Sequence, residues 1–408
     1  MDNNIIKIQS LIEKYKIDCL VMINKECSDT VFCKYIINNI TTLSLCFVFK
    51  NRAYVLLHDL EKDNKYNYLN NITYIYYKDN IEFIEKIEDI LSDNLFVVNI
   101  GLPYSTFDDK DIDILGHGEY LKYTKIFKNI YKKYNKKLTI KSSEKVIYSL
   151  LQEKSEDEIL KLKNLCNITE NIFIKSFKKI QVGMSEIDIY NKIRECFNDV
   201  TKKYIKDNIN STDIIYFDYS WENCPIVLTG ENLIKGGHTL PTDKLLKFGD
   251  TIYIDFGICA TYKNGSKLYT DLQRMGYALN IKEKVVPSHV QKVFNTLVDS
   301  IEESLDYIKP CVKGYKIDDI VRNYILNKGY PNYNHATGHP VGNKVHDVGA
   351  VITNKLQKRS SIELVKNGVY TIEPRIAIQN GGSIEEMIQV TDFGGIPISN
   401  IQKKLYVI

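Results

Sequence analysis

Five side chains that can bind metal ions follow one another in the C-terminal part of the chain: Asp255, Asp271, His339, Glu373 and Glu385. Each falls in a segment typical of a β-strand or of a turn beside one. Four carboxylates and one imidazole suit a pair of hard or borderline divalent ions better than one tetrahedral zinc ion. Without cations the carboxylates would repel one another, and some would take up protons. The pattern therefore predicts a site for two divalent metal ions.

The two aspartates flank a predicted hairpin turn at Lys263-Asn264-Gly265. Because strand faces alternate, the length of the loop decides whether the two carboxylates can meet. A two-residue turn would pair Ile258 with Asp271 and put the aspartates on opposite faces. A three-residue loop would pair Gly257 with Asp271 and make Asp255 a diagonal neighbour on the same face, with Cα atoms roughly 7–8 Å apart. We predict the three-residue loop, or a bulge with the same effect.

Three of the seven histidines, His335, His339 and His346, lie within twelve residues of sequence. Gly338 and Gly342 between them allow the backbone to come close to a ligand or to a neighbouring strand. A single histidine would more often have a structural role, but the cluster favours a functional site.

Glu373 and Glu385 are acids within otherwise apolar strand patterns. Pro374 restricts Glu373 to an extended conformation. A buried acid is costly unless it is paired or bound to a metal ion. The alternative is an edge strand whose acids face water, and the pattern alone leaves both open.

Two domains are expected to position these residues, since 408 residues can bury two cores. Residues 1–142 alternate short β-rich runs, such as 18–23 and 95–100, with helical patterns, which predicts a smaller α/β domain with a mixed sheet. Residues 143–408 begin with helices opened by Ser155 and Ser185, followed by strands, helices and further strands. This order predicts an α+β domain.

The composition excludes several classes of protein. A net charge of +3 with dispersed lysines gives no electrostatic case for a nucleic-acid partner. No apolar run approaches 18 residues, and the first residues do not resemble a signal peptide. The nine cysteines are scattered and never spaced C-x-x-C, as is typical of reduced thiols. We therefore expect a cytoplasmic protein that binds neither nucleic acid nor a membrane.

Together, these residues and their neighbours resemble the pita-bread metallopeptidases, which include Xaa-Pro aminopeptidase, prolidase and methionine aminopeptidase. The matching sequences are YIDFG, YTDLQR, TGHPVG, VHD, TIEP and IEEM followed by VT. The likeness covers about residue 150 to the end, and residues 1–142 more faintly resemble the N-terminal domain of creatinases and prolidases. It implies a C-terminal pita-bread fold, a homodimer and two divalent ions, with manganese preferred over Co2+, Fe2+ or Zn2+.

The resemblance also implies a role for each metal-binding residue. Asp255 would bind one ion, while Asp271 and Glu385 would bridge the two. His339 and Glu373 would complete the second ion's ligands. A water activated by the ions would be the nucleophile, and Glu373 would take its proton and pass it to the leaving amine.

Four further residues match substrate-contacting positions of the family. His346 matches the histidine that hydrogen-bonds the substrate beside the reacting carbonyl. His238 matches a catalytic and substrate-binding histidine of Xaa-Pro-cleaving members, and His335 one that lines the proline pocket. Without the resemblance, His238 would be read as a loop residue. Arg359 lies where prolidases can place an arginine that binds a substrate carboxylate.

The chain departs from the family pattern at three places. The hairpin between Asp255 and Asp271 is longer than usual. Arg375 stands where most relatives have glycine, and Ser383 stands where an arginine usually supports the metal carboxylates. These differences bear on activity and on metal preference.

The resemblance implies a dinuclear metal-dependent exopeptidase that cleaves between an N-terminal residue and proline, as an Xaa-Pro aminopeptidase does. One alternative is an Xaa-Pro dipeptidase, or prolidase, which requires a free carboxylate after proline. Another is a non-catalytic member of the fold that binds peptides or proteins. Such members usually lose metal ligands, and none is lost here.

Overall fold

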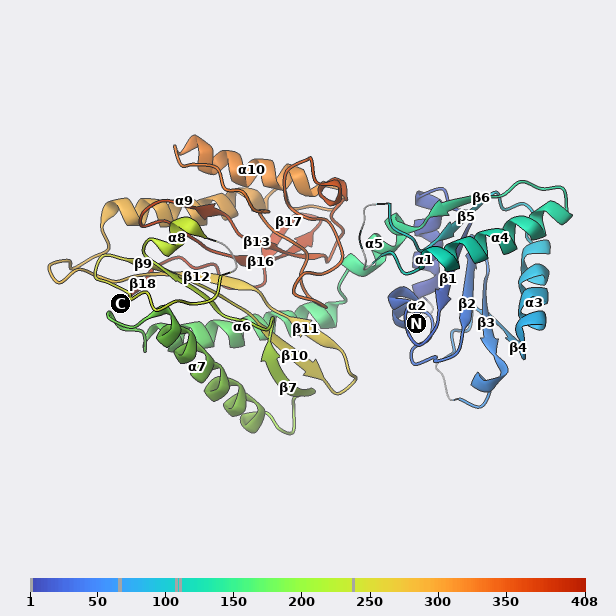
Figure 1. The fold of residues 1–408 in the computed structure, drawn as a ribbon, viewed down its shortest axis with the longest axis horizontal. Helices are drawn as coiled ribbons and strands as arrows, with labels where there is room; N and C mark the ends of the chain where they lie inside the picture. Colours follow the sequence, from blue (N-terminus) through green and yellow to red (C-terminus); the bar gives the residue numbers. More distant parts are fainter. Residues whose placement is uncertain (1–2, 65–67, 107–108, 110–111, 237–238) are drawn as a thin grey trace. The chain divides into compact units, whose positions relative to one another are not determined.

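A computed structural model describes residues 3–64, 68–106, 109, 112–236 and 239–408 of the chain (Figure 1). The chain divides into two units, Met1–Leu151 and Gln152–Ile408. The division proposed from sequence, after residue 142, lies just ahead of helix α5 (Glu144–Gln152). Within the described residues, no helix combines the length and the apolar character needed to cross a membrane.

The first unit is built on a mixed sheet with the strand order β4-β3-β2-β1-β5-β6. Its strands are β1 (Cys19–Asn24), β2 (Ser44–Phe49), β3 (Ala53–His58), β4 (Thr73–Tyr77), β5 (Asn99–Leu102) and β6 (Thr139–Ser142). Its helices are α1 (Asn3–Lys14), α2 (Thr30–Tyr35), the 3-10 turn η1 (Asp59–Glu61), α3 (Asn80–Ser92) and α4 (His117–Lys133). The β1–β2 and β2–β3 pairs are antiparallel and the others are parallel, so the predicted mixed sheet is confirmed.

One strand of this unit starts later than its apolar run predicts. The run covers 95–100, but β5 begins at Asn99, and Phe96 and Val98 are exposed. The Asp18 carboxylate accepts hydrogen bonds from the backbone N–H groups of Val98 and Asn99, at 3.0 and 2.8 Å. This contact holds the backbone just where the strand begins.

The second unit opens with α6 (Glu156–Phe177) and α7 (Glu186–Asp207), as the capping residues predicted. The Ser155 hydroxyl accepts from the Glu158 N–H at 3.2 Å, and the Glu158 carboxylate accepts from the Ser155 N–H at 2.7 Å. Ser185 and Asp188 make the same reciprocal contacts at the start of α7. Both helices therefore begin at a capping box.

Small sheets fill the space between two pairs of helices in this unit. The strands are β7 (Ile214–Tyr219), β8 (Ile226–Thr229), β9 (Thr251–Phe256), β10 (Ile258–Tyr262), β11 (Lys267–Tyr269), β12 (Leu272–Tyr277), β13 (Val369–Ile372), β14 (Arg375–Ile376), β15 (Gly382–Ser383), β16 (Glu386–Thr391), β17 (Gly394–Pro397) and β18 (Tyr406–Val407). The remaining helices are α8 (Asn232–Lys235), α9 (Ser288–Leu305), α10 (Gly314–Asn327) and the 3-10 turn η2 (Lys358–Ser361). In Figure 1, α6 and α7 lie on one side of β9, β12, β13 and β16, and α9 and α10 lie on the other.

Two hydrophobic cores follow from this layering. One joins α6 and α7 to the β9–β12 region through residues such as Phe173 and Phe256, whose rings meet edge to face 5.7 Å apart. The other joins α9 and α10 to β13 and β16 through residues such as Phe294 and Ile388. The two strand systems meet where Gln273 and Glu385 exchange backbone hydrogen bonds of 3.3 and 3.2 Å.

The hairpin between the two aspartates has the predicted three-residue loop. Strands β10 and β11 pair Thr261 with Lys267, and the Tyr262 N–H donates to the Ser266 carbonyl at 2.9 Å, which leaves Lys263-Asn264-Gly265 as the loop. Strands β9 and β12 continue in the same register, with Gln273 opposite Asp255. Asp271 therefore lies on the same face as Asp255, and the prediction is confirmed.

Arg274, fully buried in β12, ties the two strand systems together beside the site. Its guanidinium donates to the Glu385 carbonyl at 3.0 Å and to Glu386 at 3.2 Å, and it also pairs with Glu170. Burial raises the pKa of Glu386, and the Arg274 charge opposes that rise. The arginine therefore stabilises buried charges that would otherwise lack a counter-ion.

Replacing Arg274 with Met is expected to destabilise the protein by about 3–5 kcal/mol, since Glu170 and Glu386 lose their buried partner. Urea unfolding measures the change. The control is Lys403→Met, which removes a cation from the exposed Glu302 and should cost less than about 1 kcal/mol. Similar losses of stability in the two variants would contradict the role of Arg274 as a buried counter-ion.

Candidate metal centre

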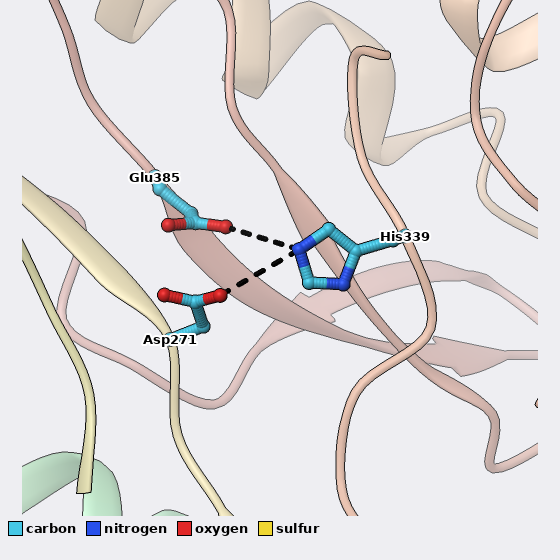
Figure 2. A group of neighbouring side chains, drawn as sticks. All are labelled: Asp271, His339 and Glu385. Atoms are coloured by element: carbon cyan, nitrogen blue, oxygen red, sulfur yellow. Dashed lines mark ion pairs between the residues drawn. The ribbon is translucent and has the colours of Figure 1, made fainter. Parts of the chain in front are cut away.

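Three of the predicted ligands converge at the meeting point of the two strand systems. Figure 2 shows the carboxylates of Asp271 and Glu385 facing the ring of His339. His339 Nε2 lies 3.6 Å from Asp271 Oδ2 and 3.8 Å from Glu385 Oε1. One ligand atom from each residue lies within 4.8 Å of the others, a spacing at which one metal ion can bind all three.

The other two predicted ligands border the same group. Glu373 Oε1 lies 3.9 Å from His339 Nε2. Gln273 joins Glu373 to Asp255, since its side-chain amide donates to Glu373 Oε2 at 3.1 Å and lies 3.5 Å from Asp255 Oδ2. The Tyr253 hydroxyl donates to Asp255 Oδ2 at 3.2 Å. The structure thus brings all five predicted residues to one place.

Backbone pairing fixes the position of His339, which lies outside any strand. The Thr371 N–H of β13 donates to the His339 carbonyl at 2.8 Å, and the Glu373 N–H donates to the Thr337 carbonyl at 2.7 Å. This close approach requires Gly338, because a Cβ at that position would lie 1.9 Å from the Thr371 carbonyl oxygen. The glycine therefore allows the histidine segment to lie directly against β13.

The electrostatics of the site favour bound cations. Asp255, Asp271 and Glu385 are 4%, 6% and 1% exposed, too buried for water to screen their charges. Burial, and then repulsion by neighbouring carboxylates, raises the pKa of Asp271 and Glu385 well above the usual range. The same causes raise the pKa of Glu373 to about 8.

The hydrogen bond from Gln273 lowers the pKa of Glu373, but hydrogen bonds offset little of the repulsion at Asp271 and Glu385. Among the residues that the structure describes, none donates a hydrogen bond to either carboxylate oxygen of Glu385 or to Oδ1 of Asp271. Buried acceptors of this kind are unfavourable unless a cation or a proton meets them. The donor set of carboxylates and one imidazole therefore fits divalent metal ions.

Two cavities adjoin these ligands. The larger, of about 640 Å³, is lined by residues that include Glu373, His339, Arg359 and Arg375. The smaller, of about 290 Å³, has four apolar lining residues, Trp221, Ile226, Leu240 and Val345, beside polar ones that include Asp255 and Asp271. Asp255 and His346 border both cavities, so a molecule in either one can reach the ligand cluster.

The predicted substrate-contacting residues that the structure describes lie at the larger cavity. The ring of His346 lies 4.5 Å from that of His339, and His335 Nδ1 lies 2.7 Å from the Ala336 carbonyl. Arg359 also lines the cavity and donates to the Gly349 carbonyl at 3.0 Å. His238 lies outside the described residues.

Sequence reasoning missed three residues at this site. Gln273 links two ligands, and it could have been found because it lies two residues after Asp271 on the same strand face. Tyr253 could have been found in the same way from Asp255. Arg375 was noted only as a departure from the family. No pattern in the sequence predicts that it lines the cavity.

Comparison with solved structures identifies the fold. The X-Pro aminopeptidase from Thermotoga maritima matches with a TM-score of 0.61 and 22% identity, covering 97% of this chain and 99% of that one. The Xaa-Pro dipeptidase from Bacillus anthracis matches with a TM-score of 0.63 and 21% identity, covering 100% and 99%. These similarities show the pita-bread fold, as the sequence predicted.

Sequence comparison identifies the family. Metallopeptidase family M24 matches residues 161–392, and the chain belongs to this family. A peptidase of Bacillus subtilis named YqhT is 29% identical over 262 residues, which are 62% of this chain and 64% of that protein. The Xaa-Pro dipeptidase of Pyrococcus horikoshii is 25% identical over 276 residues, 66% and 70% of the two chains. The chain thus spans a little under two thirds of the YqhT length.

Members of this family use divalent metal ions, and the buried group of Asp271, His339 and Glu385 is the candidate site for them. The family resemblance predicted from the sequence is confirmed.

Proposed function

We propose that this chain is a divalent-metal-dependent exopeptidase that hydrolyses the bond between an N-terminal residue and a following proline. The observation that carries the proposal is the grouping of Asp271, His339 and Glu385. Glu373 lies 3.9 Å from His339, and Gln273 joins Glu373 to Asp255. Related proteins named as Xaa-Pro dipeptidase and X-Pro aminopeptidase support the choice of bond.

The proposed ligands are Asp255, Asp271, His339, Glu373 and Glu385. Bound divalent ions would supply a water of lowered pKa as the nucleophile and would polarise the scissile carbonyl. The Glu373 carboxylate, whose side chain is 17% exposed toward the cavity, would accept the proton of that water. As the bond between the carbonyl carbon and the prolyl nitrogen breaks, Glu373 would return the proton to that nitrogen. One water is consumed, and a free carboxylate and a free amine are formed.

Substrate contacts are proposed for the histidines. His346 stands beside His339 and borders both cavities, where it can donate a hydrogen bond to the peptide next to the reacting carbonyl. His335, at the larger cavity, would contact the proline ring together with Tyr333, whose ring lies 4.8 Å from it. The role of His238 remains a prediction from the family resemblance.

A peptide panel with metal added back to chelated protein tests the proposal. Ala-Pro and Ala-Pro-Ala are expected to be cleaved after Ala when Mn2+ is present, while Ala-Ala and the metal-free protein are expected to show no cleavage. Cleavage of Ala-Pro alone would assign a dipeptidase, and cleavage of both an aminopeptidase. If both proline peptides stay intact with Mn2+, Co2+, Fe2+ and Zn2+, the proposed function is wrong. The preference for manganese, the homodimer and the cytoplasmic location stay predictions.

A further inference from the structure

Arg375 projects a guanidinium group into the wall of the larger cavity. It is the first residue of β14 and pairs with Ser383 of β15. Its Nη2 donates to the Leu233 carbonyl of α8, and its guanidinium fills the space that a side chain at Gly236 would occupy. Gly236 has a φ of 61°, a conformation that favours glycine, so both its backbone and its missing side chain accommodate the arginine.

The charge of Arg375 has no acidic partner among the described residues. No described carboxylate lies within 4.0 Å of its guanidinium, whereas Arg274 pairs with Glu386 at 3.1 Å and Arg322 pairs with Asp318 at 2.6 Å. A half-buried cation beside an open cavity is stabilised when an anion enters that cavity. The counter-ion of Arg375 is therefore to be sought among the molecules that the cavity binds.

Arg359, the other arginine of the cavity, is engaged in a different way. Its Nε and Nη2 donate to the Gly349 carbonyl at 3.2 and 3.0 Å, and Nη2 also donates to the Asp347 carbonyl at 3.2 Å. These contacts use one edge of its guanidinium to hold the loop that follows His346. The family resemblance points to Arg359 for carboxylate binding, but the geometry favours Arg375.

The two cavities differ in the chemistry that they offer a peptide. Lys235, next to Gly236, adds a third cation to the larger cavity beside Arg359 and Arg375. The smaller cavity offers Trp221, Leu240 and Val345. A peptide that lies across the metal ligands would place an apolar group in the smaller cavity and an anionic group in the larger one.

We propose that Arg375 binds a carboxylate group of the substrate peptide in the larger cavity. This inference rests on the proposed function. A guanidinium presents parallel N–H donors that match the two oxygens of a carboxylate. The carboxylate has two possible sources, the free C-terminus of an Xaa-Pro dipeptide and an acidic side chain of a longer peptide.

Matched substrates separate these sources. The first pair is Ala-Pro and Ala-Pro amide, and the second is Ala-Pro-Glu amide and Ala-Pro-Gln amide, in which the side chain follows the proline that lies in the larger cavity. For each pair, the selectivity is the ratio of kcat/KM for the acid to kcat/KM for the amide. Arg375→Gln is expected to lower at least one of these ratios about tenfold or more. A change of this size corresponds to the free energy that a charge-assisted hydrogen bond contributes. A fall in the first ratio assigns the C-terminus, and a fall in the second assigns the side chain.

Two further variants serve as controls for an effect of misfolding on the ratios. Arg375→Lys keeps the charge without the planar fork, so its ratios should lie between those of the wild type and Arg375→Gln. Arg52→Gln makes the same chemical change in the first unit, remote in sequence from the site, and should leave both ratios unchanged. Unchanged ratios in both Arg375 variants would overturn the proposal.

A binding measurement keeps the inference separate from the proposed catalytic activity. Calorimetry on the Mn2+-loaded protein compares proline with prolinamide, and glutamic acid α-amide with glutamine α-amide. The wild type is expected to bind the acid of at least one pair about tenfold more tightly, and Arg375→Gln to lose this preference. If the preference is present but no Xaa-Pro peptide is cleaved, the proposed function fails and the carboxylate site stands. If the wild type prefers neither acid, the inference is wrong even for an active peptidase.

Discussion

The Glu373→Gln variant is expected to lose about a thousandfold in kcat/KM on Ala-Pro, within the range of roughly 100 to 10,000 for a general acid–base group. Glutamine keeps the size of the side chain, but it does not accept a proton at neutral pH. It also has no negative charge with which to bind a metal ion. Glu373 is the most exposed carboxylate of the group, at 17% for the side chain, so it can exchange a proton with a bound peptide. Steady-state kinetics at saturating Mn2+ measures the loss.

Elemental analysis of the same variant separates its two proposed roles. Loss of activity with the metal content retained would assign proton transfer, and loss of both would make binding of the ion the main role. Glu302→Gln, the same change on the exposed surface of α9, is the control and should keep wild-type activity. If Glu373→Gln keeps more than a tenth of the wild-type kcat/KM, its catalytic role is excluded.

The part of the site built on paired strands could be predicted from the sequence. The positions of Asp255 and Asp271 follow from the period of two in a strand and from a loop of three residues, both of which are local properties. The helix starts at Ser155 and Ser185 are equally local, since the capping residues lie three positions apart. Local rules therefore accounted for these elements.

Features that depend on distant packing could not be predicted in this way. The late start of β5 depends on the Asp18 carboxylate, which lies about eighty positions earlier in the chain. The contact of Arg375 with Leu233 joins β14 to α8 across a separation of 142 residues. Neither contact leaves a periodic pattern in its own segment, so only the folded structure reveals them.

Metal binding is expected to decide the stability of this protein as well as its activity. A ligand held at a thousand times its dissociation constant stabilises the folded state by about 4 kcal/mol, and chelation removes that contribution. The effect should be concentrated at the site, because Asp271 and Glu385 are buried together and repel each other when no cation lies between them.

The Asp271→Asn variant tests this argument, because the order of stability of variant and wild type should reverse when metal is added. Without metal, asparagine removes one of the repelling charges and its amide can donate to the neighbouring carboxylates, so the variant should be more stable than the wild type by about 1 kcal/mol or more. With Mn2+ the order should invert, since the variant has lost a ligand. Thermal unfolding of both proteins, with chelator and with excess Mn2+, measures the four stabilities.

The control for this reversal is Asp318→Asn, another buried aspartate, which pairs with Arg322 at 2.6 Å. Its removal leaves a cation without its partner, so it should destabilise the protein both with and without metal. The difference between the two aspartates is the sign of the charge that each one faces in the folded chain. Asp318 already has its cation in Arg322, whereas Asp271 faces other carboxylates and depends on an ion from solution. A metal-free Asp271→Asn protein that is less stable than the metal-free wild type would show that repulsion at this site is weak, and the electrostatic case for bound cations would fail with it.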